Sequence, residues 1–73
     1  MSKDDKILKV IKELAKGKGS KLSLTSIYRG VIQKGIYTSE NYIRNALKRL
    51  EIRGKIKTGE MDQIELLPEG DGN

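Results

Sequence analysis

The sequence predicts an α+β domain in which three helices are followed by a two-stranded β-hairpin. Three observations point to this fold class. Apolar residues recur at helical spacing in three successive segments, glycines stand where those segments end, and beyond Gly54 polar and apolar residues alternate loosely. At 73 residues the chain suits one small domain with a single core. We expect the domain to span residues 1–68 and the acidic tail, residues 69–73, to be disordered.

The first helix is expected to begin after Ser2 and to run to about Lys16. Ser2 can cap its first turn, and Asp4 and Asp5 suit the positive end of the helix dipole there. Four aliphatic residues at helical spacing would form its inner face: Ile7, Val10, Ile11 and Leu14.

A glycine-rich turn at residues 17–20 and a short extended piece at residues 21–23 are expected between the first and second helices. The turn superficially resembles a phosphate-binding loop. Such a loop follows a strand and needs Gly-Lys-Ser/Thr in direct succession, whereas this turn follows a helix and has glycine in place of the hydroxyl residue. We interpret it as the end of the first helix.

The second helix should begin at Leu24 or Thr25 and end at about Lys34, with Gly35 as its stop. Its buried face would consist of Leu24, Ile27, Tyr28 and Val31. Gly30, in the middle, lowers helix propensity by about 1 kcal/mol relative to alanine. We therefore expect a neighbouring helix to cross close to Gly30.

The third helix is predicted within the stretch from Thr38 to Ile56. Thr38 or Ser39 can cap its start, and Gly54 can close its end in the left-handed conformation. Its buried face would consist of Ile43, Ala46, Leu47 and Leu50. The opposite face collects Asn41, Arg44, Asn45, Lys48 and, at one flank, Arg49. With the second helix and the short turn between them, it makes a helix-turn-helix.

After the third helix, two short strands around Ile56 and Ile64 are expected to form a hairpin with its tip at residues 59–62. Pro68 ends the second strand region. The side chains predicted to face the helical core are Ile56, Ile64 and Leu66. Three helices followed by such a hairpin define a winged helix-turn-helix.

The charges are divided unevenly along the chain. Residues 1–58 carry all 15 Lys and Arg and five of the 10 acids, a net charge of +10, whereas residues 59–73 carry the other five acids and no base, a net charge of −5. A basic body attracts polyanions such as nucleic acid through phosphate neutralisation and counterion release. The sequence therefore favours double-stranded DNA as the partner.

Enzymatic chemistry is disfavoured because the chain has neither histidine nor cysteine. It lacks the usual general base at neutral pH, the imidazole of a catalytic triad and the ligands of a thiolate zinc site. Three carboxylates near the hairpin tip, Glu60, Asp62 and Glu65, are interpreted as solvated acids, because the ligand spacing of a calcium loop is absent. We expect no catalytic residue, cofactor, metal or small-molecule substrate.

No apolar run approaches the length of a signal sequence or a membrane span. We expect a soluble cytoplasmic protein, associated with the nucleoid, and no membrane partner. A charged fraction of 34%, abundant isoleucine and the absence of Cys, His, Trp and Phe are typical of a thermophilic source.

The stretch from Ile43 to Ile56, IRNALKRLEIRGKI, resembles the recognition helix and the start of the wing in winged helix-turn-helix regulators of the MarR, ArsR and Lrp kind. In those families Leu-x-x-Leu, a charged pair, a glycine and an aliphatic strand recur in this order. The order of elements across residues 4–67 is also similar, and in size and isoleucine-lysine content the chain resembles small winged-helix proteins of crenarchaeal viruses and plasmids. The resemblance implies a small transcriptional regulator that reads the major groove with its third helix, at about residues 39–53.

Two sets of DNA-contacting residues follow from the families' pattern and from side-chain chemistry. Five residues are placed in or along the major groove: Ser39, Asn41, Arg44, Asn45 and Lys48. Seven are expected near phosphates: Ser23, Thr25, Arg29, Tyr42, Arg49, Lys55 and Lys57. The families' wings carry Arg or Lys at the tip, whereas this tip carries Glu60 and Asp62, which a phosphate backbone would repel.

The acidic tip favours an alternative function, a winged-helix protein-interaction module that contacts a basic partner through the wing and Ile52. Ile52 is predicted to lie on the outer face of the third helix. A homodimer would present two recognition helices about 34 Å apart, one turn of DNA. Further apolar candidates for such an interface are Leu8, Ala15 and Ile36.

Overall fold

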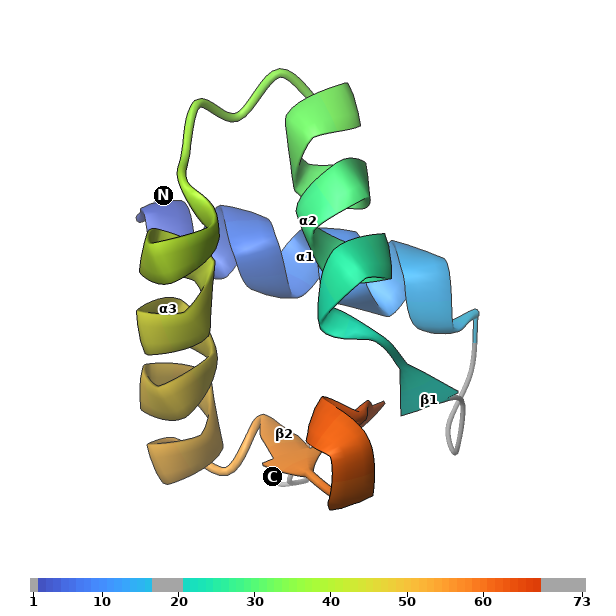
Figure 1. The fold of residues 1–73 in the computed structure, drawn as a ribbon. Coiled ribbons are helices and arrows are strands. Elements are labelled where there is room, and N and C mark those ends of the chain that lie inside the picture. The colour runs from blue at the N-terminus through green and yellow to red at the C-terminus, as the bar shows by residue number, and fades with distance from the viewer. Residues whose placement is uncertain (1, 17–20, 68–73) are drawn as a thin grey trace.

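The computed structural model describes residues 2–16 and 21–67 as a small α+β domain (Figure 1). Its elements, in chain order, are α1 (Lys3–Ala15), β1 (Lys21–Leu22), α2 (Leu24–Gln33), α3 (Glu40–Ile52), β2 (Ile56–Thr58), the short 3-10 helix η1 (Glu60–Asp62) and β3 (Ile64–Leu66). The α+β class and the three helices are therefore confirmed. The glycine-rich turn at residues 17–20 and the acidic tail lie outside the described residues.

The sheet has three antiparallel strands, in the order β1-β3-β2, where the sequence predicted two. The expected extended piece after the first helix is the additional strand: Lys21 lies opposite Glu65, and Leu22 lies opposite Ile64. A strand of two residues is too short to show an alternating pattern in the sequence. Its pairing depends on contacts with β3, which is more than 40 residues away in the chain.

Serine side chains cap all three helices at their N-termini. The Oγ atoms of Ser2, Ser23 and Ser39 each accept a hydrogen bond of 3.1 Å from a backbone N–H three residues later. At the other ends, Gly35 (φ 80°) and Gly54 (φ 76°) adopt the predicted left-handed conformation. The first helix differs, because Lys16 itself takes this conformation (φ 52°) and the helix ends at Ala15.

The core lies between the three helices and is closed at one end by the sheet. Its largest fully buried side chains are Ile7, Ile11, Ile27, Ile43, Leu50, Ile56 and Val31. Figure 1 shows α1 crossing behind α2. At the crossing, a Cβ added to Gly30 would lie 3.0 Å from Leu14 Cδ1 and 3.1 Å from Val10 Cγ1. The close approach predicted for Gly30 is thus confirmed.

The burial pattern revises the apolar interface candidates. Leu8 and Ala15 are buried within the domain, with 7% and 2% of their surface exposed, so they are not available to a second subunit. Ile36 is half-buried against the core. Ile52, by contrast, is 85% exposed. Within the described ranges, no helix is long and apolar enough to cross a membrane.

Candidate nucleic-acid interface

The exposed face of α3 carries four of the five residues expected to contact bases. Asn41, Arg44, Asn45 and Lys48 are all exposed, because Ile43, Ala46, Leu47 and Leu50 hold the opposite face of the helix in the core. The fifth residue, Ser39, is also exposed, but its Oγ caps α3 by accepting the Tyr42 backbone N–H. α3 thus presents two amides and two cations on one side.

The α3 face borders the start of α2 and the second strand. A shallow hollow of about 100 Å³ is lined by Leu24, Arg44, Leu47, Lys48, Thr58 and Ile64. Of the residues expected near phosphates, Thr25 and Arg29 are exposed one turn apart on α2. The Ser23 hydroxyl caps that helix and donates a 3.0 Å hydrogen bond to Ser26 Oγ. Arg44 and Lys48 therefore lie where α2, α3 and β2 meet.

An acidic residue next to the α3 face changes the expected electrostatics. Glu40, the first residue of α3, accepts hydrogen bonds from Arg44 Nη2 at 3.1 Å and from Arg44 Nε at 3.3 Å. Both side chains are about half exposed, at 49% for Arg44 and 58% for Glu40. Water and salt screen such a pair, so it is weak and Arg44 can exchange its partner for a base or a phosphate.

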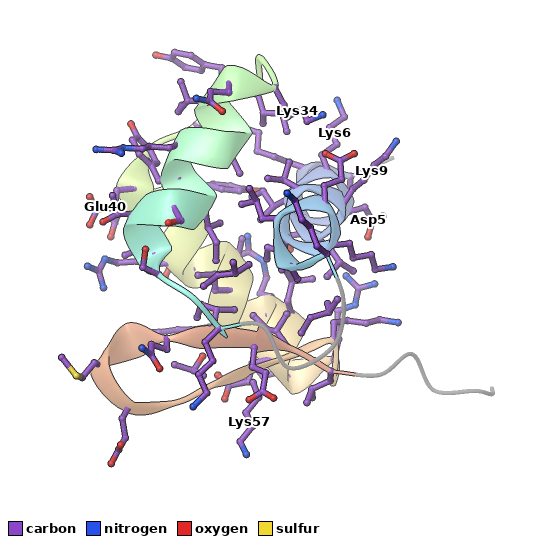
Figure 2. The ribbon with its side chains drawn as sticks, turned by 90° about the vertical axis from the view of Figure 1, so that its right-hand side faces the viewer. Asp5, Lys6, Lys9, Lys34, Glu40 and Lys57 are labelled. Atoms are coloured by element: carbon purple, nitrogen blue, oxygen red, sulfur yellow. The ribbon has the colours of Figure 1, made fainter. Side chains whose placement is uncertain are left out.

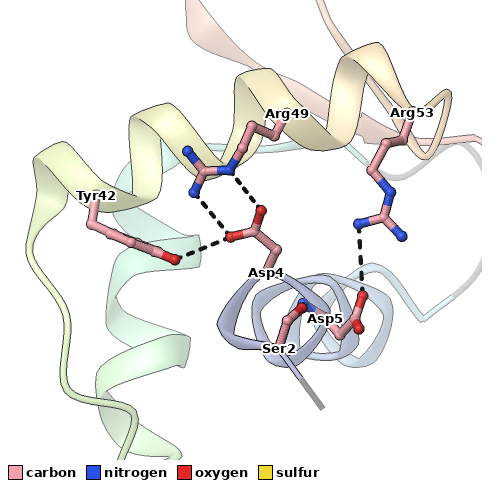
Figure 3. A network of polar contacts seen from close by, with 6 residues as sticks. All are labelled: Ser2, Asp4, Asp5, Tyr42, Arg49 and Arg53. Atoms are coloured by element: carbon pink, nitrogen blue, oxygen red, sulfur yellow. Dashed lines mark hydrogen bonds and ion pairs between the residues drawn. The ribbon is translucent and has the colours of Figure 1, made fainter.

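Arg49 and Tyr42, both expected near phosphates, are instead joined to α1 (Figure 3). Arg49 donates from Nε to Asp4 Oδ2 at 2.7 Å and from Nη2 to Asp4 Oδ1 at 3.0 Å. The Tyr42 hydroxyl donates to the same Oδ1 atom at 3.3 Å. A fork of two parallel hydrogen bonds is the strongest arrangement of an arginine with a carboxylate. Arg49 therefore docks α3 onto α1.

A second ion pair extends this contact, because Arg53 Nη1 lies 3.7 Å from Asp5 Oδ1. The sequence explained Asp4 and Asp5 only by the dipole of the first helix. Two adjacent acids on one helix and two arginines four residues apart on another can indicate ion pairs between the two helices. This pattern becomes informative only once α1 and α3 are known to be neighbours.

The network shifts the ionisation of its members. The hydrogen bonds and charge of Arg49, with help from Tyr42, outweigh burial and hold the pKa of Asp4 below its usual value. Asp4 in turn raises the pKa of Arg49, chiefly through the same hydrogen bonds. A carboxyl group with a lower pKa in the folded protein than in the unfolded chain stabilises the fold. This stabilisation is complete at pH values above the pKa in the unfolded chain, and it is lost as the pH falls through the pKa in the folded protein.

We therefore expect Asp4→Asn to lower the melting temperature by roughly 4 °C at pH 7, as for one well-oriented ion pair in a domain of this size. The difference from the wild-type protein should begin to shrink below about pH 4, where Asp4 becomes protonated in the unfolded chain, and should be lost as the pH falls through the lower pKa of Asp4 in the folded protein. Thermal melts followed by circular dichroism between pH 2 and pH 7 measure this. Glu60→Gln, at the exposed hairpin tip, is the control. If Asp4→Asn keeps the wild-type pH profile, the ion pair does not stabilise the fold.

The outer face of the sheet is oriented differently from the α3 face. Lys57 and Lys21 lie on either side of Glu65 across the three strands, on the sheet face opposite the buried Ile56 and Ile64. Figure 2 shows Lys57 pointing away from the helices. The structure therefore separates Lys57 from the α3 face. Lys55 precedes β2 and is half-buried.

Comparisons of the chain with known protein families, curated proteins and solved structures find no match. The likeness of the stretch from Ile43 to Ile56 to the regulator families thus stays a resemblance. In the described part of the chain, no group of three or more His, Cys, Asp or Glu residues is arranged to hold a metal ion. What remains as a candidate site is the polar and cationic face of α3.

Proposed function

We propose that this chain is a winged helix-turn-helix protein that binds double-stranded DNA in a sequence-specific manner, as a small transcriptional regulator. The observation that carries the proposal is the outward face of α3, where Asn41, Arg44, Asn45 and Lys48 are exposed together. These are the side chains that read bases and neutralise phosphates.

The arrangement of the elements supports this function. α2 and α3, joined by residues 34–39, supply the two helices of a helix-turn-helix, and the β2–β3 hairpin after α3 supplies a wing. With 13 residues, α3 is about 20 Å long, and the major groove, about 12 Å wide, admits a helix. The forked ion pair from Arg49 to Asp4 on α1 helps to hold α3 in a fixed orientation, which a base-reading helix needs.

Each side chain on the α3 face has a distinct role in this proposal. Asn41 and Asn45 can make paired hydrogen bonds to adenine N6 and N7, and Arg44 can do so to guanine O6 and N7. Lys48 contacts a phosphate, as does Arg29 on α2. The hairpin tip does not take part, because Glu60 is exposed there and repels phosphate.

The test begins with the selection of bound sequences from a random duplex pool, with the oligomeric state measured in parallel. On the selected duplex, Asn45→Ala should cost about 1 to 3 kcal/mol and relax the preference at one base pair. On random duplex it should bind as the wild-type protein does. Arg29→Gln should instead weaken both duplexes alike and lower the salt slope by about 0.9. Equal losses for Asn45→Ala on both duplexes would show that α3 does not read bases.

The alternative, a protein-interaction module, is favoured by two exposed apolar side chains. Ile52 is 85% exposed on α3, and Met61 is 92% exposed beside Glu60 at the hairpin tip. In this function the cations of α3 are simply solvated. It predicts no binding to random duplex DNA at low salt, where the DNA-binding proposal predicts the strongest association. A palindromic consensus from the selection would instead support DNA binding by a homodimer.

A further inference from the structure

A second basic surface lies away from the α3 face, in an open groove between α1 and the segment that joins α2 to α3. The groove has a volume of about 590 Å³, in the range of pockets that hold small organic groups. Its charged and aromatic lining residues are Lys3, Lys6, Lys9, Glu13, Lys34 and Tyr37. Figure 2 shows Lys6, Lys9 and Lys34 on one side of the molecule and Glu40, the start of α3, on the other.

The groove has an excess of positive charge. Four lysines line it against one acid, Glu13, which pairs with Lys34 Nζ at 2.9 Å. Lys6 and Lys9 have no ion-pair partner within residues 2–16 and 21–67. Three of the lysines repeat every three residues over about 9 Å of α1, so they follow one side of the helix and form a cationic track. A polyanion would relieve their mutual repulsion.

Tyr37 is the second unusual feature of the groove, because 93% of its surface is exposed. The other two tyrosines, Tyr28 and Tyr42, are partly buried against the core. Tyr37 also lines an adjoining hollow of about 230 Å³ together with Lys3 and Ser39, so this residue borders both depressions. The exposed ring of Tyr37 contributes little to the packing of the fold. It is available to stack against the planar base of a ligand.

We infer that this groove binds single-stranded nucleic acid, with the lysines along its phosphates and one base stacked on Tyr37. A cationic groove with an aromatic side chain is the recurring chemistry of single-strand binding. Duplex DNA fits less well, because its bases are already stacked on one another and leave no face for the tyrosine. An acidic peptide would engage the lysines but leave the ring unused. The inference does not depend on duplex binding by α3, since the residues and the ligand differ.

The stacking is tested with a fluorescein-labelled 15-nucleotide oligo(dT) and the full chain, by fluorescence anisotropy. Tyr37→Ala should weaken binding about 5- to 150-fold, the effect of losing one base–aromatic stack, whereas Tyr37→Phe should bind as the wild-type protein does. Because Tyr37 is almost fully exposed, both variants should melt as the wild-type protein does. Binding of Tyr37→Ala to duplex DNA should be unchanged, which separates this site from the α3 face.

The charge contribution is tested with matched single substitutions. Lys9→Gln should lower the slope of log affinity against log salt for oligo(dT) by about 0.7, the value for one phosphate contact on a single strand. Lys21→Gln removes the same charge from the outer sheet face and should leave the slope unchanged. Unlabelled duplex and a hexaglutamate peptide are added as competitors, and both should compete poorly.

Three results would overturn the inference. Wild-type affinity of Tyr37→Ala for oligo(dT) would show that no base stacks on this ring. An equal loss in Tyr37→Phe would assign the effect to the hydroxyl group. Effective competition by hexaglutamate or by duplex would show that the groove takes an acidic peptide or any polyanion, not single-stranded nucleic acid.

Discussion

A Leu50→Ala variant should lose about 3 to 5 kcal/mol of unfolding free energy, the range found when a leucine is cut back in a packed core. Leu50 is fully buried near the end of α3, in a cluster that contains residues from all three helices and from β2 and β3. The lost transfer free energy and the cavity add together, because a core formed by short elements on every side cannot collapse completely around the gap.

For a domain of this size the effect is large. At about 0.05 to 0.15 kcal/mol per residue, a chain of 73 residues has a total stability of about 4 to 11 kcal/mol. The melting temperature should fall by more than about 10 °C, or the variant should be unfolded at room temperature. Thermal and urea unfolding followed by circular dichroism measure this.

Ile52→Ala is the matched control, because it removes an aliphatic side chain from the same helix two residues away. Ile52 is 85% exposed, so its removal should change the unfolding free energy by less than about 0.5 kcal/mol. Similar melting temperatures for the two variants would contradict the division of α3 into a buried and an exposed face. The proposed DNA interface depends on that division.

The helices could be predicted because their information is local. The apolar spacing of Ile43, Leu47 and Leu50, the capping Ser39 and the left-handed Gly54 all belong to one stretch of chain, and each acts within a turn or two. Gly30 allowed one prediction about a contact between helices. A glycine within a helix lowers its stability, so a close helix crossing was expected there, and Leu14 and Val10 of α1 do lie against Gly30.

The features that sequence reasoning missed are contacts between segments distant in the chain. β1 exists only because β3 pairs with it, and Asp4 is 45 residues from Arg49. Successive residues of β2 face opposite sides of the sheet, so the buried Ile56 directs Lys57 away from the helical core and from α3. The resemblance to the regulator families led to the opposite expectation, that Lys57 contacts phosphate beside the third helix. The direction of Arg44 and Lys48 was therefore predictable from helical spacing, whereas the contacts of Arg49 with a distant segment were not.

The contacts of these side chains reduce the number of cations that the structure leaves open to duplex DNA at the α3 face. Arg49 is held by Asp4, Lys57 points away from the helices, and Glu40 accompanies Arg44. Within residues 2–16 and 21–67, the cations that stay on the outward face of α3 are Arg44 and Lys48, and Arg29 is exposed on α2. With so few, each should contribute a large share of the affinity for duplex DNA.

An Arg44→Gln/Lys48→Gln variant should accordingly bind duplex DNA about 60-fold more weakly at 0.1 M salt. Arg44 at a guanine and Lys48 at a phosphate both bring positive charge against the duplex and displace counterions. At about 0.9 per cation, their loss lowers the slope of log affinity against log salt by about 1.8, which amounts to about 1.8 decades between 1 M and 0.1 M. Both side chains are exposed, so the variant should keep the wild-type melting temperature within a few degrees. Anisotropy titrations of a labelled duplex from 50 mM to 300 mM salt give both the affinity and the slope.

Lys21→Gln/Lys57→Gln is the decisive comparison, because it removes the same two charges from the outer face of the sheet. At 0.1 M salt exposed charges act over about 10 Å, so a cation that does not touch the duplex contributes little to affinity. We expect the control to bind within about threefold of the wild-type protein, with its slope nearly unchanged. If it loses as much affinity as the α3 variant, the duplex lies against the sheet or is attracted by net charge alone, and α3 is not the recognition helix.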